Sequence, residues 1–126
     1  MLVLLLTALA GGFGGAARFL VDTTVTRHVR TSLPMGTVVV NTTACLLLGL
    51  VTGYALTDAG ADDLRAIIGV GLLGGYSTFS TASVEGYRLL RQERPLAALL
   101  HSGGMLAICL ATAWLGLLLG GLPSTS

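Results

Sequence analysis

Four long stretches of this 126-residue chain contain no charged side chain. These stretches are residues 1–17, 31–57, 66–84 and 95–126. An α-helix needs about 20 largely apolar residues to cross the hydrocarbon core of a bilayer, so each stretch has room for one crossing. We therefore predict four transmembrane helices, at about residues 2–21, 36–56, 66–84 and 96–119.

The composition excludes most soluble classes of protein. Charged residues make up only 10% of the chain and hydrophobic residues 53%, whereas soluble domains carry about 25% charged residues. A soluble domain of this size needs a polar shell, because a small body has much surface for its volume. The net charge of +1 also argues against binding nucleic acid. We predict a single all-α domain over residues 1–126, a multi-pass protein of the cell membrane.

Two sequence features have a second interpretation. Ala8-Leu9-Ala10 resembles a signal-peptidase site, but no basic residue precedes it and cleavage would destroy the first span. We interpret the segment as a membrane span. Cys45 and Cys109 both lie deep in predicted spans without a metal-binding or disulfide pattern, so they are interpreted as small packing residues.

Polar residues inside the predicted spans point to function. Arg18 near the end of the first span either extends to the headgroups or serves a functional site. Asn41 opens the second span and shares a stripe, at steps of four, with Cys45, Gly49 and Gly53. Small residues at this spacing predict a closely packed helix face. The Asn41 amide either joins two helices or coordinates an ion.

The third span carries the strongest signal, a run of glycines and hydroxyl residues over residues 69–81. Such a run forms a poor continuous helix. Non-helical backbone is tolerated at membrane depth only where it is buried in protein or lines an aqueous cavity. Broken membrane helices offer free carbonyls to cations and free N–H groups to anions. We predict a broken third helix with an ion site; a kink satisfied by Ser and Thr hydroxyls is the alternative.

These residues resemble the signature of the Fluc (CrcB) family of fluoride channels. The matching segments are Gly11-Gly12 through Arg18, Gly36-Thr37 through Asn41, and Gly74 through Thr81 followed by Glu85. The resemblance covers all four spans. It implies an antiparallel, dual-topology dimer in membrane lipid that exports cytoplasmic fluoride passively and is not an enzyme. It also implies a structural sodium ion at the dimer centre, which is not transported.

The resemblance also assigns site residues. Backbone carbonyls of Gly74 and Ser77 would hold the sodium ion, and Asn41 and Phe79 would line the fluoride path. By the chemistry of their side chains, Ser80, Thr81, His101 and Thr112 would be further donors on that path, with Arg18 as a structural, anion-attracting group. Fluoride is strongly hydrated, so a pore must offer it hydroxyl and amide donors or the positive edge of an aromatic ring.

This chain departs from the family pattern at the pore. Ala82 replaces a second phenylalanine, His101 replaces a tyrosine, and Met105 occupies a polar position. One alternative is therefore a structural subunit with a degraded pore. A small four-helix drug exporter is a second, less favoured alternative; it would need a carboxylate inside a span, and the only candidate is Glu85 at the end of the third. An intramembrane enzyme is disfavoured because His101 and Ser102, adjacent on a helix, point apart.

The arginines are unevenly distributed between the two sides of the predicted bundle. One side carries Arg65 alone; the other carries Arg27, Arg30, Arg88, Arg91 and Arg94. The positive-inside rule places the second side in the cytoplasm. A chain that inserts in both orientations needs balanced arginines. We therefore predict a heterodimer with a paralogous subunit of opposite bias, and a homodimer if both orientations are found.

Overall fold

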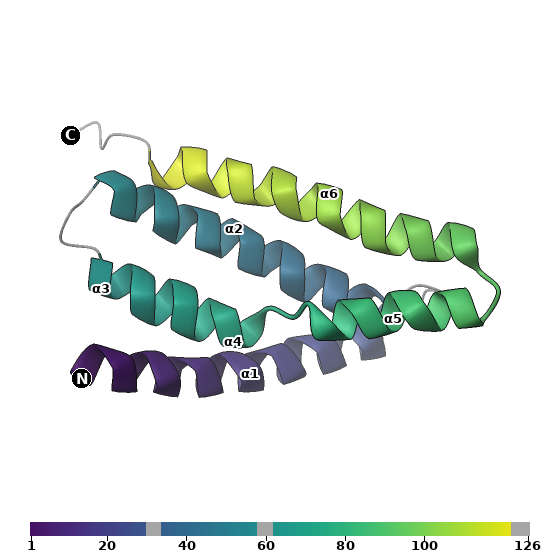
Figure 1. Ribbon diagram of the computed structural model, residues 1–126, viewed down its shortest axis with the longest axis horizontal. Coiled ribbons are helices and arrows are strands. Elements are labelled where there is room, and N and C mark those ends of the chain that lie inside the picture. Colours follow the sequence, from purple (N-terminus) through teal and green to yellow (C-terminus); the bar gives the residue numbers. More distant parts are fainter. Residues whose placement is uncertain (30–33, 58–61, 122–126) are drawn as a thin grey trace.

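The computed structural model describes residues 1–29, 34–57 and 62–121, and the part it describes is helical (Figure 1). Arg30 and Asp58, which belong to the predicted loops, lie outside these residues. The elements are α1 (Leu2–His28), α2 (Met35–Thr57), α3 (Asp62–Leu64), η2 (Arg65–Leu73), α4 (Gly74–Tyr76), α5 (Ser80–Arg91) and α6 (Pro95–Gly120). Among the described residues, four segments are long and apolar enough to cross a membrane: Leu2–His28, Met35–Leu56, Arg65–Arg91 and Pro95–Gly120. The predicted all-α, four-span, multi-pass architecture is confirmed.

Two of the spans extend beyond their predicted ends. Helix α1 continues past Val21 to His28, and α5 continues past Val84 to Arg91. The end of an apolar run marks the membrane boundary, whereas a helix ends only where its backbone hydrogen bonds stop. Basic residues occupy the last turn of both helices, where they interact favourably with the negative end of the helix dipole.

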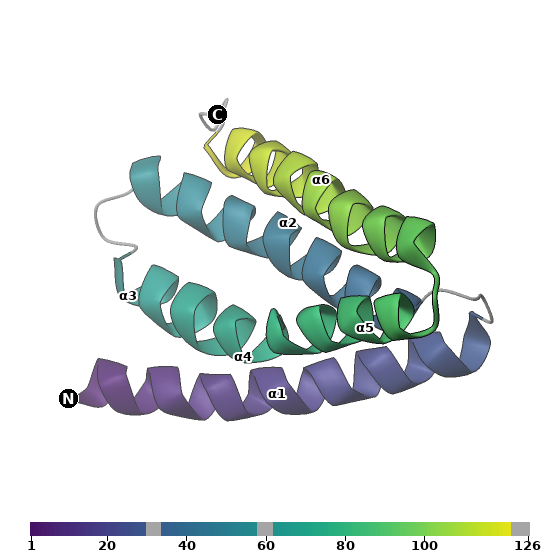
Figure 2. The same cartoon turned by 45° about the vertical axis from the view of Figure 1, so that its right-hand side comes forward.

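The predicted break in the third span is present. Its first half is a π-helix, η2, followed by the short α4. Ser77 is then extended, with φ −74° and ψ 161°, and α5 begins at Ser80 (Figure 2). Wide π-turns and breaks are frequent at functional sites. The glycines of residues 69–75 favour both, because glycine is a poor helix former.

Helices α2 and α6 lie side by side and run in the same direction (Figures 1 and 2). A Cβ atom added at Gly49 would lie 3.0 Å from the Cα of Gly116, and one added at Gly120 would lie 2.9 Å from the Cα of Leu50. Only glycine permits this approach. The predicted small-residue face of α2 is therefore confirmed, and its partner is α6.

Helix α1 packs against the first half of the third span through glycine as well. A Cβ atom added at Gly75 would lie 2.9 Å from the Cα of Gly11, and one added at Gly14 would lie 2.9 Å from the Tyr76 backbone nitrogen. On its other side, the Tyr76 hydroxyl is 2.9 Å from Thr43 Oγ1 of α2. The segment before the break is thus covered by α1 on one side and by α2 on the other, whereas Gly74 is exposed.

Candidate functional site

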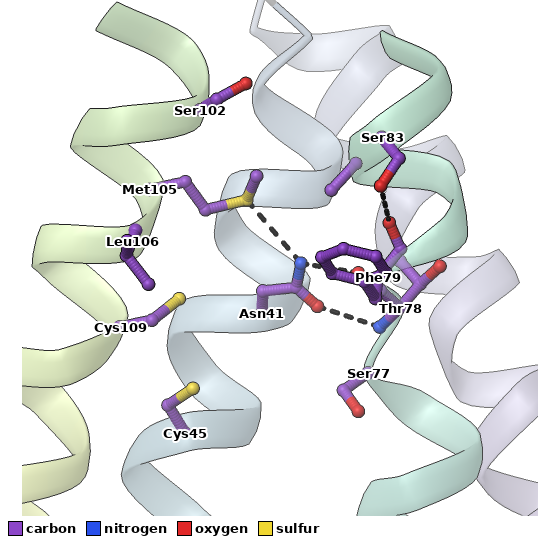
Figure 3. Close-up of a pocket in the computed structure, with 11 residues that line it drawn as sticks. Asn41, Cys45, Ser77, Thr78, Phe79, Ser83, Ser102, Met105, Leu106 and Cys109 are labelled. Carbon is purple, nitrogen blue, oxygen red and sulfur yellow. Dashed lines mark hydrogen bonds between the residues drawn. The ribbon is translucent and has the colours of Figure 1, made fainter. Parts of the chain in front are cut away.

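The break in the third span is held by one side chain of α2. The Thr78 amide donates to Asn41 Oδ1, and Asn41 Nδ2 donates to the Thr78 carbonyl, both at 2.8 Å (Figure 3). Thr78 is only 7% exposed, and a buried backbone group without a partner is costly. Asn41 therefore joins α2 to the third span, which is the helix-joining role considered for it in the sequence.

The same clamp changes the hydrogen bonding of the residues just before the break. In a continuous α-helix the Thr78 amide would donate to the Gly74 carbonyl, but here it donates to Asn41 Oδ1. The Ser77 carbonyl accepts a hydrogen bond of 3.4 Å from Arg18 Nη1. Arg18 thus extends from α1 toward the break and not toward the headgroups. The predicted cation ligands are the carbonyls of Gly74, the first residue of α4, and of Ser77, which directly follows its last residue.

A cavity of about 420 Å³ lies beside the break, between α2, α5 and α6. Its lining consists of Asn41, Cys45, Ser77, Thr78, Phe79, Ala82, Ser83, Ser102, Met105, Leu106 and Cys109. Figure 3 shows Phe79 next to the Asn41 clamp, with the side chains of α6 opposite. Phe79 is 86% exposed although it adjoins buried backbone. The structure therefore brings together two predicted fluoride-path residues, Asn41 and Phe79, and two departures from the family pattern, Ala82 and Met105.

Three other predicted path residues lie away from this cavity. Ser80 and Thr81 open onto a separate hollow of about 260 Å³ with Glu85 and Arg88. Thr112 Oγ1 donates to the Thr42 carbonyl at 3.3 Å and to the Cys109 carbonyl at 3.1 Å. Hydroxyl groups in helices often bond to the carbonyl of the preceding turn in this way, so Thr112 serves the α2–α6 contact.

His101, the remaining predicted path residue, is buried among three helices. It is 3% exposed, and its Nε2 lies 3.3 Å from Glu85 Oε2 of α5. The other oxygen of that carboxylate accepts a hydrogen bond of 2.7 Å from Thr37 Oγ1 of α2. Sequence reasoning named these three residues separately and missed their cluster, because nothing in their spacing places one from each helix at the same depth.

Sequence reasoning also missed the exposure of the two cysteines to the cavity. The sequence predicts that Cys45 and Cys109 are packing residues, and Figure 3 shows them on the facing helices α2 and α6. Both are partly exposed, and both line the cavity. The available signal was a spacing of four residues, which places two side chains on the same helix face. It separates Met105 from Cys109 on α6 and Asn41 from Cys45 on α2.

Comparison with known proteins identifies the family. The model of the family described as CrcB-like protein, Camphor Resistance (CrcB) matches residues 5–117. A Leifsonia xyli protein named fluoride-specific ion channel FluC 1 is 47% identical, over 96% of this chain and 88% of its own length. A Cutibacterium acnes protein named fluoride-specific ion channel FluC 2 is 41% identical, over 94% of this chain and 98% of its own length. The chain belongs to the CrcB (Fluc) family, as the motif in its third span predicted.

Proposed function

We propose that this chain is a subunit of a fluoride-specific channel through which fluoride leaves the cytoplasm passively. The observation that carries the proposal is membership of the CrcB family, with relatives named fluoride-specific ion channels across nearly the whole chain. The cavity beside the break supports it, because it places an exposed aromatic ring at a site where the backbone is held open. No chemical conversion is part of this function.

The cavity offers an anion two kinds of favourable group. The edge of an aromatic ring carries the positive part of its quadrupole, and Phe79 presents its ring almost fully exposed. Hydroxyl groups of Ser77 and Ser102 also line the cavity and can donate hydrogen bonds. The amide of Asn41 contributes by fixing the backbone beside Phe79, since its nitrogen already donates to the Thr78 carbonyl.

A second subunit would complete the path. Phe79 faces outward from the single chain, so a dimer is needed to enclose it, and we propose the antiparallel dimer of the family. Carbonyls of Gly74 and Ser77 from both subunits would hold a structural sodium ion. Carbonyl oxygen is a ligand that suits alkali cations. The Ser77 carbonyl has two lone pairs, which allows it to accept from Arg18 and to coordinate the ion.

We further propose that the second subunit is a paralogue. Ala82 and Met105 give this chain's cavity fewer aromatic and hydroxyl groups than the family pattern, and its arginines favour one orientation. A paralogue inserted the opposite way would supply the second pore lining. If one chain inserts both ways, a homodimer takes its place.

Fluoride efflux from liposomes tests the function. Vesicles loaded with potassium fluoride and given valinomycin should lose fluoride without a proton gradient, and vesicles loaded with potassium chloride should retain chloride. The chain should be reconstituted both alone and together with its paralogue. Flux that requires a proton gradient would indicate an exporter. Absence of flux in both preparations would contradict the channel.

A further inference from the structure

Three sulfur atoms line the cavity beside the break, and the proposed fluoride path uses none of them. Cys45 comes from α2, and Met105 and Cys109 come from consecutive turns of α6 (Figure 3). Met105 Sδ lies 3.5 Å from Nδ2 of Asn41, and Asn41 stands one turn before Cys45 on α2. Two thiols and a thioether therefore face the same space.

The neighbouring helix contact fixes the relative position of these residues. Gly49 and Gly53 lie one and two turns beyond Cys45, and Gly49 meets Gly116 of α6 at backbone distance. Side chains cannot intervene between the two helices there, so the approach of Cys45 to Cys109 is set by the backbone. A ligand set held by rigid elements binds more tightly than one that must be assembled.

Sulfur ligands select soft metal ions. Thiolate and thioether groups favour Cu(I) and ions like it over Na⁺, Mg²⁺ or Ca²⁺, which favour oxygen. Binding one monovalent ion breaks one S–H bond, forms a metal–thiolate bond and releases one proton to water. The second thiol and the Met105 thioether then bind as neutral donors. The occupied site has no net charge, which suits an apolar cavity.

We propose that Cys45, Met105 and Cys109 form a binding site for one soft monovalent metal ion, Cu(I) or Ag(I). An ion bound there lies in the cavity that Phe79 faces, and so it blocks the fluoride path. The blocking effect rests on the proposed function, whereas the binding site does not.

Silver retention tests the site directly. The purified channel is incubated with silver nitrate in chloride-free buffer and desalted, and bound silver is measured by atomic emission. We expect one silver ion per chain. Cys45→Ser and Cys109→Ser should each weaken binding by about tenfold or more, since even changes outside the ligand shell reach that scale. Met105→Leu should weaken it by less, and Met35→Leu is the matched control because Met35 lies outside the cavity lining.

Two results would overturn the site. One is two silver ions per chain, with each serine variant keeping one at unchanged affinity, which would show independent thiols. The other is equal binding by the Met105→Leu and Met35→Leu proteins together with unchanged binding by the serine variants. Each variant is first checked for an unchanged circular dichroism spectrum and elution volume, so that misfolding does not imitate loss of binding.

Fluoride efflux in the presence of silver fluoride, which is soluble, tests the block. Silver should stop efflux through the unmodified channel and leave the Cys45→Ser/Cys109→Ser channel conducting. Silver retention without a block would overturn the blocking half of the proposal. Silver retention by a protein that passes no fluoride even without silver, alone or with its paralogue, would instead overturn the proposed function and leave the metal site supported.

Discussion

Asn41 replaces, with a single side-chain amide, the backbone hydrogen bonds that Thr78 loses at the break. Asn41→Leu keeps the size of the side chain but leaves a buried amide and carbonyl unpaired, at a cost of about 1–3 kcal/mol each. We expect a lower melting temperature in detergent and faster hydrogen exchange at the Thr78 amide. Asn41→Asp keeps the hydrogen-bond acceptor for the Thr78 amide, so its melting temperature should lie between those of the unmodified protein and Asn41→Leu. A leucine variant as stable as the unmodified protein would show that the clamp contributes little.

Phe79 is the proposed aromatic group of the fluoride path, and its exposed ring lies outside the core of the single chain. Because the side chain is 86% exposed, Phe79→Ile should leave the folding of the subunit unchanged while it lowers fluoride flux in the assembled channel. Phe13→Ile is a suitable control, since Phe13 is also exposed, at 73%, and lines none of the described cavities. The measurement is efflux per reconstituted dimer. Equal flux through both variants would reduce Phe79 to a packing residue.

At the scale of whole helices, adjacent glycines of the third span have different roles. A Cβ atom at Gly75 would collide with α1 at Gly11, whereas the nearest atom to one at Gly74 is the Gly69 carbonyl oxygen, 4.0 Å away. We therefore expect Gly75→Val to separate α1 from the third span and to destabilise each subunit.

Gly74→Val should leave the subunit folded and disrupt the dimer, because its side chain would lie beside the proposed sodium ligands. Ser77→Ala, which keeps its carbonyl, should be milder. Proteolysis of the subunit and light scattering of the assembly distinguish these outcomes. If Gly74→Val still dimerises as well as Ser77→Ala, the carbonyl site is not at this position.

The sequence predicted the number of membrane spans and the break in the third, because charge distribution controls the first and local glycine content the second. It did not predict the ends of α1 and α5, since helix ends follow hydrogen bonding and not hydropathy. It also did not predict which hydroxyls face the cavity. The Thr112 hydroxyl donates to the carbonyls of Thr42 and Cys109 at the α2–α6 contact. These hydrogen bonds depend on how closely the two helices approach, which the sequence does not show.

At the scale of the whole molecule, four of the six described arginines lie at one end of the bundle, and Arg18 and Arg65 lie elsewhere. Arg27 lies in the last turn of α1, and Arg88, Arg91 and Arg94 lie at or near the turn between α5 and α6. Figures 1 and 2 place both regions at the same end, opposite the N-terminal end of α1. The helix packing therefore preserves the asymmetry that the sequence predicts.

This asymmetry determines how the chain should insert and with what it should pair. From the positive-inside rule we expect the arginine-rich end to face the cytoplasm and the N-terminal end of α1 to face outward. We expect a periplasmic-type reporter fused before α1 to be active and a cytoplasmic-type reporter there to be inactive. Balancing the arginines between the two ends of the bundle should produce both orientations. Arg88→Gln and Arg91→Gln, with two arginines added beside Arg65, would make this change. Either of two results would show that one sequence supplies both subunits of the dimer and that the paralogue is unnecessary. One is that the unmodified chain is found in both orientations in comparable amounts, and the other is that it conducts fluoride when purified alone.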